Sequence, residues 1–336
     1  MPASPDRRYR GAIIGLGGIA RQSHLPALAL PAASRLDIVA AVDAAPGVAP
    51  LPGVPLFREL PALAGLDLDF VDICTPTASH LELTLWALEH GLHVLCEKPV
   101  ALTPEQAERI RCAARAANRV VMPCHQYRFN PVWGKVRRWL DDEAIGRWYL
   151  AEFDVYRLMA DPGAGRTATP WRGRAAEAGG GVLLDHGTHL IYQLLDVAGP
   201  PAGVRAWAGR LRHAAYDVED TAHLLLEFPG RLAKVFLTWA AHRRENRIRF
   251  IGERGTIDWT GGLLTLERDG TVETFDHSAE LSKDAYAAWF ADLFGAFVRA
   301  MDARDHDPLN DIARVADVLE AAYASGPAGA ALVGAA

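Results

Sequence analysis

Short apolar runs alternate with amphipathic stretches along the first third of the chain. The apolar runs lie at 12–16, 38–42, 70–74, 93–96 and 120–122. Between the later runs, 79–90 and 103–118 carry apolar side chains at helical spacing. Short apolar strands that alternate with helices are typical of a parallel sheet covered by helices on both faces. The pattern therefore predicts an α/β fold with a doubly wound parallel sheet over residues 1–124.

Local signals mark the ends of the helix expected at 103–118. Thr103 offers a side-chain oxygen as the N-cap, Pro104 fits the first turn, and Gln106 completes a capping box. Asn118 follows the last turn. This helix is the best delimited element that the sequence predicts.

The pattern changes after residue 124. A helix is expected at 130–141, and the later apolar segments alternate apolar with polar positions. These segments are 222–228, 233–239 and 247–251, with glycine turns at 229–230, 252–255 and 269–270. Such alternation with short turns predicts hairpins, so residues 125–336 are expected to form an α+β domain with an open, mainly antiparallel sheet. Two terminal helices, near 285–301 and 311–324, are available to pack back on the first domain.

Length and charge restrict the class of protein. At 336 residues the chain exceeds a single ordinary core, so two domains are expected. The formal net charge of −6 disfavours a nucleic-acid partner, because binding to phosphates needs a basic surface. The densest basic run, 243–249, is interrupted by Glu245 and Asn246, which indicates a solvated face.

Hydropathy and cysteine content give two further expectations. No apolar run is long enough to span a membrane, and the polar start 1–10 lacks the apolar centre of a secretory signal. We therefore expect no membrane contact and a cytoplasmic location. The four cysteines, Cys74, Cys96, Cys112 and Cys124, include no C-x-x-C pair. Reduced, buried thiols are expected rather than a zinc site or disulfides.

A glycine-rich turn directly follows the first predicted strand. Gly15, Gly17 and Ala20 fit the pattern G-x-G-x-x-G/A, and Gly18 and Ile19 lie between them where a helix opens. Glycines permit a tight turn and close backbone approach, and a helix N-terminus attracts phosphate. We expect these five residues to bind the pyrophosphate of a dinucleotide, the alternative being a turn that serves packing alone.

An acidic residue ends the second predicted strand. Asp43 is placed to accept hydrogen bonds from the adenosine ribose and to repel a 2′-phosphate. Ala44 and Ala45 follow it, and no arginine adjoins it in sequence to hold that phosphate. NAD is therefore expected rather than NADP. The alternative for Asp43 is a solvated strand-end carboxylate.

Six segments share a recognisable pattern. They are Cys74-Thr75-Pro76-Thr77-Ala78-Ser79-His80, Cys96-Glu97-Lys98-Pro99, Tyr127-Arg128-Phe129-Asn130-Pro131, Trp171-Arg172, Gly179-Gly180-Gly181 through Asp185 to His189, and 252–257. Together they resemble the Gfo/Idh/MocA family of sugar and cyclitol oxidoreductases, similar to inositol dehydrogenases and glucose-fructose oxidoreductase. The resemblance covers nearly the whole chain. It implies an NAD(P)-binding Rossmann domain at 1–124 and, at 125–336, a substrate domain whose open sheet joins subunits into a homodimer or homotetramer.

The same resemblance implies roles for individual residues. Lys98, Asp185 and His189 are implied as the catalytic group. The residues implied beside the cofactor are Thr75, Pro76, His80, Glu97 and Lys98. Gln126 and Tyr127 are implied as part of a substrate pocket for a sugar or cyclitol.

The position of Lys98 also has a direct physical reading. It follows a parallel strand, and such sheets place ligands at the carboxyl ends of their strands. An ammonium there can donate to the reacting oxygen and stabilise alkoxide charge. The alternative is a surface lysine that extends from a strand end, which the neighbouring Glu97 and Pro99 make less favourable.

Asp185 and His189 are four residues apart in an expected helix, so both are expected on one face. The carboxylate can then orient the imidazole, and a histidine has the right intrinsic pKa to move a hydroxyl proton. The alternative is a capping aspartate with a core histidine. His186 is assigned to substrate contact rather than to a metal, because no fourth ligand is evident. Tyr192 stands where many relatives carry aspartate, and it either bonds a sugar hydroxyl or packs.

Trp171 and Arg172 lie in a Gly- and Ala-rich loop, which also holds Pro162 and Pro170 and is long enough to cover an active site. Trp171 offers an apolar face to sugar C–H groups, and Arg172 can bind hydroxyls or a carboxylate. Packing alone is the alternative for each. His80 and His125 are ambiguous between packing and a place beside the nicotinamide.

These observations predict an NAD-dependent oxidoreductase that transfers hydride between nicotinamide and a secondary hydroxyl or keto group of a sugar, sugar derivative or cyclitol, without a metal. Two alternatives stay open. One is an NADPH-dependent keto-sugar reductase of the same family, and the other is a non-catalytic NAD-sensing binding protein. The sequence identifies neither the sugar, nor the carbon, nor the direction.

Overall fold

A computed structural model describes residues 7–160, 170–281 and 283–325 of the chain. Its backbone divides into two compact units. Unit 1 comprises Met1–Phe129 and Lys283–Ala313, and unit 2 comprises Asn130–Ser282 and Arg314–Ala336. The boundary predicted at residue 125 lies close to the start of unit 2, and one terminal helix belongs with unit 1. The functional division of the two domains stays a prediction.

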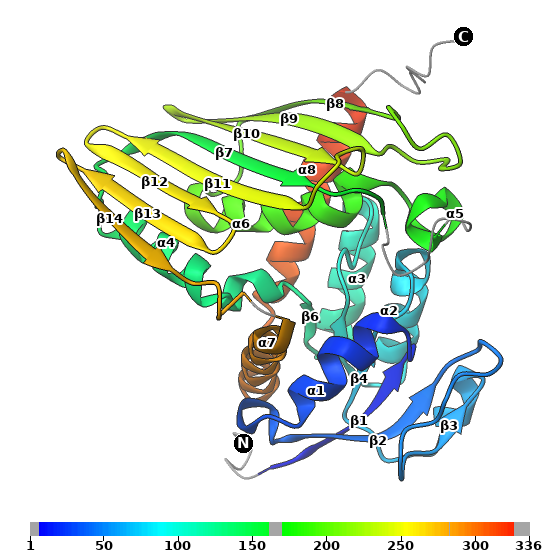
Figure 1. The fold of residues 1–336 in the computed structure, drawn as a ribbon. Coiled ribbons are helices and arrows are strands. Elements are labelled where there is room, and N and C mark those ends of the chain that lie inside the picture. The colour runs from blue at the N-terminus through cyan, green and yellow to red at the C-terminus, as the bar shows by residue number, and fades with distance from the viewer. Residues whose placement is uncertain (1–6, 161–169, 282, 326–336) are drawn as a thin grey trace. The chain divides into compact units, whose positions relative to one another are not determined.

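Unit 1 is built on a six-stranded parallel sheet with the order β3-β2-β1-β4-β5-β6 (Figure 1). Its strands are β1 (Tyr9–Ile14), β2 (Leu36–Val42), β3 (Leu56–Phe57), β4 (Phe70–Ile73), β5 (His93–Cys96) and β6 (Val121–Pro123). The predicted doubly wound sheet is confirmed. The chain winds outward in both directions from β1, so the switch point lies between β1 and β4, where sheets of this kind bind their ligands.

Helices cover both faces of this sheet. They are the π-helix η1 (Ala20–His24), α1 (Leu25–Leu28), α2 (His80–Glu89), α3 (Pro104–Ala117) and α7 (Lys283–Ala303), with short 3-10 turns η2 (Pro31–Ala33), η3 (Leu60–Leu63), η4 (Thr77–Ser79) and η5 (Gln126–Phe129). Phe290, Phe294 and Phe297 of α7 pack with Phe70 and Leu95 of the sheet into one apolar core. Unit 1 therefore takes part of its core from a segment late in the chain.

The capping signals of α3 are confirmed. Thr103 Oγ1 accepts a hydrogen bond from Gln106 N at 3.3 Å, and Gln106 Oε1 accepts one from Leu102 N at 2.9 Å. Asn118 ends the helix in the left-handed conformation, with φ of 51°.

Unit 2 carries an eight-stranded sheet with the order β14-β13-β12-β11-β7-β10-β9-β8. Its strands are β7 (Trp148–Tyr156), β8 (Gly203–Gly209), β9 (Thr221–Phe228), β10 (Arg231–Thr238), β11 (Glu245–Gly252), β12 (Gly255–Thr260), β13 (Leu263–Arg268) and β14 (Thr271–Asp276). Neighbouring strands are antiparallel except β7 and β10, which run parallel. The predicted mainly antiparallel sheet is confirmed.

Helices lie against one face of this sheet. Unit 2 contains α4 (Pro131–Asp141), η7 (Trp171–Gly173), α5 (Ala175–Ala178), the π-helix η8 (Leu183–Gly187) and α6 (Thr188–Ala198), and α8 (Pro308–Ser325) belongs to it from Arg314 onward. Figure 1 shows α4 and α6 on the same side of the sheet. The buried ring of Trp133 on α4 lies 6.2 Å from that of Phe153 and 6.4 Å from that of Phe250, so this face forms the core of unit 2.

The opposite face carries a ladder of charged side chains. Lys234 lies 3.6 Å from Glu152 and 3.3 Å from Asp154, and Arg249 lies 2.7 Å from Asp258. Part of the basic run 243–249 is thus paired across strands. Within the part of the chain that the structure describes, no helix combines the length and apolarity needed to cross a bilayer.

Candidate active site

The glycine turn lies at the carboxyl end of β1. Gly15 has φ of +92°, and a Cβ there would lie 2.9 Å from the Cys74 carbonyl group, so this position needs glycine. Gly17 and Gly18 are exposed, and a Cβ on Gly17 would meet no atom within 4 Å. Helical backbone begins at Gly18. The turn leaves open space where a pyrophosphate can approach the backbone.

Asp43 is tied directly to this turn. Its Oδ2 accepts a hydrogen bond from Leu16 N at 2.7 Å, and its Oδ1 accepts one from Ala45 N at 2.9 Å. Each carboxylate oxygen has a second lone pair, so these bonds leave acceptor capacity for ribose hydroxyls. The structure therefore brings together the two features that the sequence assigned to dinucleotide binding.

One basic residue near Asp43 escaped the sequence analysis. No arginine adjoins Asp43 in sequence, but Arg58, just after β3, donates to the carbonyl oxygens of Asp43 at 3.0 Å and Ala45 at 2.6 Å. The sequence-based expectation that no arginine lies beside Asp43 is therefore wrong, because the fold brings Arg58 next to it. Only the pairing of β2 with β3 brings Arg58 there, and β3 has just two residues, too few for a sequence pattern.

His80 connects two of the recognised segments. It is buried, its Nε2 lies 2.9 Å from the Thr75 carbonyl oxygen, and its Nδ1 lies 2.7 Å from that of Pro99. Burial lowers the pKa of His80, although the two carbonyls oppose the shift. Thr75 is half-buried and accepts from Ser79 Oγ at 2.7 Å, while Pro76 is exposed. His80 thus lies between the backbone after β4 and the backbone after β5.

Lys98 lies at the carboxyl end of β5, as its position in the sequence indicated. Its side chain is half-buried, and its backbone N–H donates to Glu97 Oε2 at 3.1 Å. Glu97 is buried. The turn at Gly15, Asp43 and Lys98 therefore follow β1, β2 and β5 at one edge of the same parallel sheet.

The segment after β6 holds the next predicted residues. Gln126 is 4% exposed, and its Oε1 has no hydrogen-bond partner among the residues described, so it can accept from a ligand. Tyr127 packs edge-on against the rings of Tyr286 at 6.2 Å and Trp289 at 6.1 Å on α7. His125 is buried, and burial together with the charges of Arg128 and Lys98 lowers its pKa well below the usual value.

The other predicted catalytic residues lie in unit 2, on η8 and α6. The Glu219 side chain accepts hydrogen bonds from Gly181 N at 3.0 Å and Leu183 N at 3.1 Å, at the start of this helical segment. The backbone of Glu219 also leaves no room for a side chain at Gly181. A Cβ on Gly181 would lie 1.9 Å from the Glu219 carbonyl oxygen. This close approach explains why a glycine stands at position 181.

Asp185 and His189 lie on a segment that begins with a π-helical turn. Asp185 Oδ2 lies 3.5 Å from Arg172 Nε and 3.2 Å from His186 Nδ1, while His189 Nδ1 lies 3.1 Å from the Tyr192 hydroxyl. The four-residue spacing assumed ordinary α-helical geometry, and a π turn rotates one side chain relative to the other. The orientation of His189 by Asp185 stays a prediction.

Two predicted substrate residues, Arg172 and His186, lie beside Asp185, and a third, Trp171, packs against Arg172. The guanidinium carbon of Arg172 lies 4.5 Å from the centre of the Trp171 ring, and both side chains are half-buried. The buried indole of Trp239 donates to His186 Nδ1 at 3.3 Å. Pro162 and the rest of 161–169 lie outside the described residues.

Among the residues that the structure describes, two groups of side chains could hold a metal, and both contain His24. Its ring nitrogens lie near Glu97 and Cys124, and near Asp72 and Cys74, in each case with the ligand atoms within 4.8 Å of one another. The sequence analysis gave His24 no role, because one histidine in a helix after a glycine turn resembles any core histidine.

Comparison with known proteins defines the class of the molecule. Residues 9–125 match the family model described as "Oxidoreductase family, NAD-binding Rossmann fold", and residues 133–258 match the "GFO/IDH/MocA C-terminal domain". The D-glucoside 3-dehydrogenase of Escherichia coli (strain K12) is 30% identical over 299 residues, which cover 82% of this chain and 82% of that protein. The chain is an NAD-binding oxidoreductase with a Rossmann fold.

A further relative and a solved structure are also similar to this chain. The scyllo-inositol 2-dehydrogenase (NADP(+)) of Bacillus subtilis (strain 168) is 32% identical over 175 residues, 52% of each protein. The structure of an inositol dehydrogenase homologue complexed with NAD+ from Azotobacter vinelandii has a TM-score of 0.80 at 24% identity and covers 95% of both chains, which shows a shared fold. The chain belongs to the Gfo/Idh/MocA family, as the resemblance predicted.

Proposed function

We propose that this enzyme transfers hydride between NAD and a secondary hydroxyl or keto group of a sugar, sugar derivative or cyclitol. The observation that carries the proposal is the common edge of the parallel sheet in unit 1. Gly15, Asp43 and Lys98 follow three strands there, so one edge combines a glycine turn, a carboxylate and an ammonium group. The relatives named as glucoside and inositol dehydrogenases support a polyhydroxylated substrate.

The proposed catalytic roles follow from the chemistry of the side chains. Bound NAD supplies the hydride acceptor at its nicotinamide ring. Lys98 donates a hydrogen bond to the reacting oxygen and stabilises its negative charge, and His189 accepts the hydroxyl proton. Asp185 supplies a negative charge that favours the protonated imidazole. Reduction of a keto group uses the same residues in reverse.

The proposed binding roles divide between the cofactor and the substrate. Gly15, Gly17, Gly18, Ile19 and Ala20 hold the pyrophosphate, and Asp43 holds the ribose. Thr75, Pro76, His80 and Glu97 shape the cofactor site, in part through the backbone. For the substrate, Gln126 offers its unpartnered oxygen to a hydroxyl, Trp171 an apolar face, and Arg172 and His186 polar contacts. Tyr127 shapes this pocket by packing.

The preference for NAD rests on Asp43, whose charge opposes a 2′-phosphate. Arg58 gives the NADP alternative a specific basis, because its guanidinium lies beside the backbone of Asp43. The choice is tested with Arg58→Ala and steady-state assays with both cofactors. A clear preference of the unaltered enzyme for NADPH, lost on removing Arg58, would overturn the assignment of NAD.

We also propose a homodimer or homotetramer formed through the sheet of unit 2, and a cytoplasmic location. Leu150 and Leu263 are exposed, and strand alternation places them on the same face as the charged ladder of Glu152, Lys234 and Arg249. A broad sheet face that mixes apolar and paired charged groups is suited to a second copy. Light scattering of the purified protein tests the assembly.

The central experiment is a substrate screen with NAD reduction as the readout. Sugars, glycosides and cyclitols are tested with the unaltered enzyme, with Lys98→Ala and with Lys135→Ala as a matched control in unit 2. We expect turnover with at least one polyol, a loss of about 100-fold or more in Lys98→Ala, and normal turnover in the control. Tight NAD binding without turnover on any substrate would instead favour the binding-protein alternative.

A further inference from the structure

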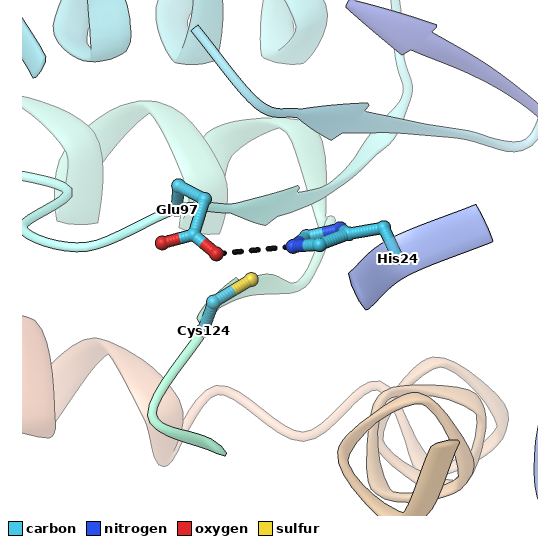
Figure 2. Close-up of side chains that lie close together, drawn as sticks. All are labelled: His24, Glu97 and Cys124. Carbon is cyan, nitrogen blue, oxygen red and sulfur yellow. Dashed lines mark hydrogen bonds and ion pairs between the residues drawn. The ribbon is translucent and has the colours of Figure 1, made fainter. Parts of the chain in front are cut away.

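His24 lies between two buried carboxylates in unit 1. Its Nδ1 lies 2.8 Å from Asp72 Oδ2, and its Nε2 lies 3.0 Å from Glu97 Oε1. The side chains of His24, Asp72 and Glu97 are 0%, 2% and 9% exposed. Figure 2 shows His24 reaching from its helix towards Glu97, which follows β5. Three elements far apart in sequence, η1, β4 and the end of β5, thus meet in one polar cluster.

The hydrogen bonds indicate that the ring carries two protons. An ionised carboxylate only accepts, so two ionised carboxylates require both ring nitrogens to donate, and the ring is then an imidazolium. Burial by itself lowers the pKa of His24, but the charges and hydrogen bonds of Asp72 and Glu97 outweigh it and raise the pKa to about 10. The rings of Phe290 and Phe294 pack against the imidazole, with centres 4.7 Å and 5.5 Å away.

A metal ion is a poorer occupant of the same cluster. It would need thiolate from Cys124 or Cys74 as its third ligand. Burial raises the pKa of both thiols well above the usual value, and the charge of a nearby carboxylate raises it further. The carboxylate oxygens also lie at direct hydrogen-bond distance from the ring nitrogens. One proton on each ring nitrogen, hydrogen-bonded to Asp72 or to Glu97, accounts for these contacts without a metal ion.

Glu97 connects this cluster to the candidate catalytic lysine. Its Oε1 is hydrogen-bonded to His24 Nε2, and its Oε2 accepts a hydrogen bond from the backbone N–H of Lys98 at 3.1 Å. We propose that His24 is a positioning residue for Lys98: as a buried cation shared by Asp72 and Glu97, it fixes the carboxylate that holds the Lys98 backbone. This proposal rests on the proposed function, in which Lys98 contacts the reacting oxygen.

The charge of His24 matters as well as its shape. Hydrogen bonding and the charge of His24, followed by the charge of Lys98, lower the pKa of Glu97 against the effect of burial, so Glu97 stays a carboxylate. Without the imidazolium, Glu97 and Asp72 are two buried anions close together, and Glu97 gains a proton or moves. Either change alters the strand end that carries the Lys98 ammonium.

Lysine side-chain NMR tests the connection without any substrate. The chain has four lysines, Lys98, Lys135, Lys234 and Lys283, so four signals are expected in carbon-13 lysine-labelled protein. Lys98→Ala identifies the signal of Lys98. In His24→Gln and in Glu97→Gln we expect this signal to move while the other three stay. An unmoved Lys98 signal in both folded variants would overturn the proposal.

The charge state is measured on the unaltered protein, so it does not depend on whether a variant folds. At about pH 8.5, well above the ordinary pKa of histidine, nitrogen-15 NMR should still show two ring N–H signals for His24. A single N–H signal, or a stoichiometric metal in the purified protein, would overturn the imidazolium. The Glu97→Gln variant should show a single ring N–H signal for His24, because the glutamine amide can donate a hydrogen bond to Nε2.

Kinetics provide the remaining test once a substrate is known. In His24→Gln we expect kcat to fall about 100-fold, as a displacement of about 1 Å can cause, with little change in the KM for NAD. Ile110→Val, a small change in the same unit outside the cluster, should leave kcat unchanged. Normal kcat in folded His24→Gln would overturn the positioning role. If the unaltered enzyme turns over no polyol, the proposed function fails, and the two NMR results still decide the cluster.

Discussion

Two carboxylates, one in each unit, hold the backbone of the candidate catalytic segments, and they are compensated in different ways. Glu97 receives the Lys98 N–H and shares a cation with Asp72, and its pKa lies below the usual value. Glu219 receives Gly181 N–H, Leu183 N–H and the Tyr323 hydroxyl, which are all neutral donors. Burial raises the pKa of Glu219 despite these bonds.

This difference in compensation determines how strongly a substitution disturbs the Lys98 segment and the start of η8. A carboxylate paired with a buried charge depends on that charge, because removing one partner leaves the other unpaired in a medium that solvates it poorly. A carboxylate held by neutral donors loses one hydrogen bond at a time. We therefore expect the Lys98 segment to respond sharply to one substitution and the start of η8 to respond gradually.

The largest effect is expected from His24→Leu. It removes the cation and leaves Asp72 and Glu97 buried and unpaired, so the free energy of unfolding should fall by about 3–5 kcal/mol. Urea unfolding at neutral pH measures the change. The triple variant with Asp72→Asn and Glu97→Gln removes the charges together and should recover part of the loss. A fall of under about 1 kcal/mol in His24→Leu would show that the cluster does not depend on its cation.

Stability should also depend on pH through the same histidine. The folded pKa of His24, about 10, lies above the unfolded value, so its contribution is complete below about pH 6.5 and is lost as the pH rises towards about 10. The free energy of unfolding should fall on the order of a few kcal/mol over this window. Glu219→Gln should keep this fall, and Glu97→Gln should reduce it. A flat profile in the unaltered protein would contradict the contrast between the two carboxylates.

A smaller loss is expected from Gly181→Ala. The added Cβ would lie 1.9 Å from the Glu219 carbonyl oxygen, so the start of η8 must shift, at a cost of about 1–3 kcal/mol. Gly134→Ala on α4 is the matched control, because its Cβ would meet nothing within 4 Å and alanine favours the helix. Thermal unfolding compares the two. Equal effects would mean that the contact of Gly181 with Glu219 is unimportant.

The smallest loss is expected from Glu219→Gln. The amide keeps one oxygen for a backbone N–H but cannot accept from the second, so the free energy of unfolding should fall by about 1–2 kcal/mol. The Lys98 NMR signal should not move. A loss as large as that of His24→Leu would remove the distinction between the charged and the neutral cluster.

Much of unit 1 follows from its sequence because its signals are local. The apolar runs identified five of the six strands. The sequence also predicted the N-cap of α3, because Thr103, Pro104 and Gln106 act on the same turn. Lys98 could be placed because a residue after a parallel strand must lie at the carboxyl edge of the sheet. The two-residue strand β3 carries no periodic signal, so it and the neighbouring Arg58 were missed.

What the sequence did not reveal depends on tertiary packing. His24, Asp72 and Glu97 are separated by 48 and 73 positions, measured from His24, and only the assembled sheet brings them together. Glu219 meets Gly181 in the same way, across 38 positions. In unit 2 Asp185 lies on the π turn η8, which no residue pattern predicted, and its ion pair with Arg172 joins η8 to η7. The strand β7 was also missed, because its polar and apolar residues do not alternate cleanly.

The place of α7 in unit 1 has a consequence for how the protein is made. The sheet of unit 1 is complete at Pro123, but the aromatic side chains that close one of its faces come from Lys283–Ala303. At about 5–20 residues per second, a ribosome needs on the order of ten seconds or more to reach them. Throughout that time the nascent sheet, including the face beside His24, lacks its cover. Deleting α7 should therefore produce a chain that associates with chaperones or aggregates instead of a smaller dinucleotide-binding protein.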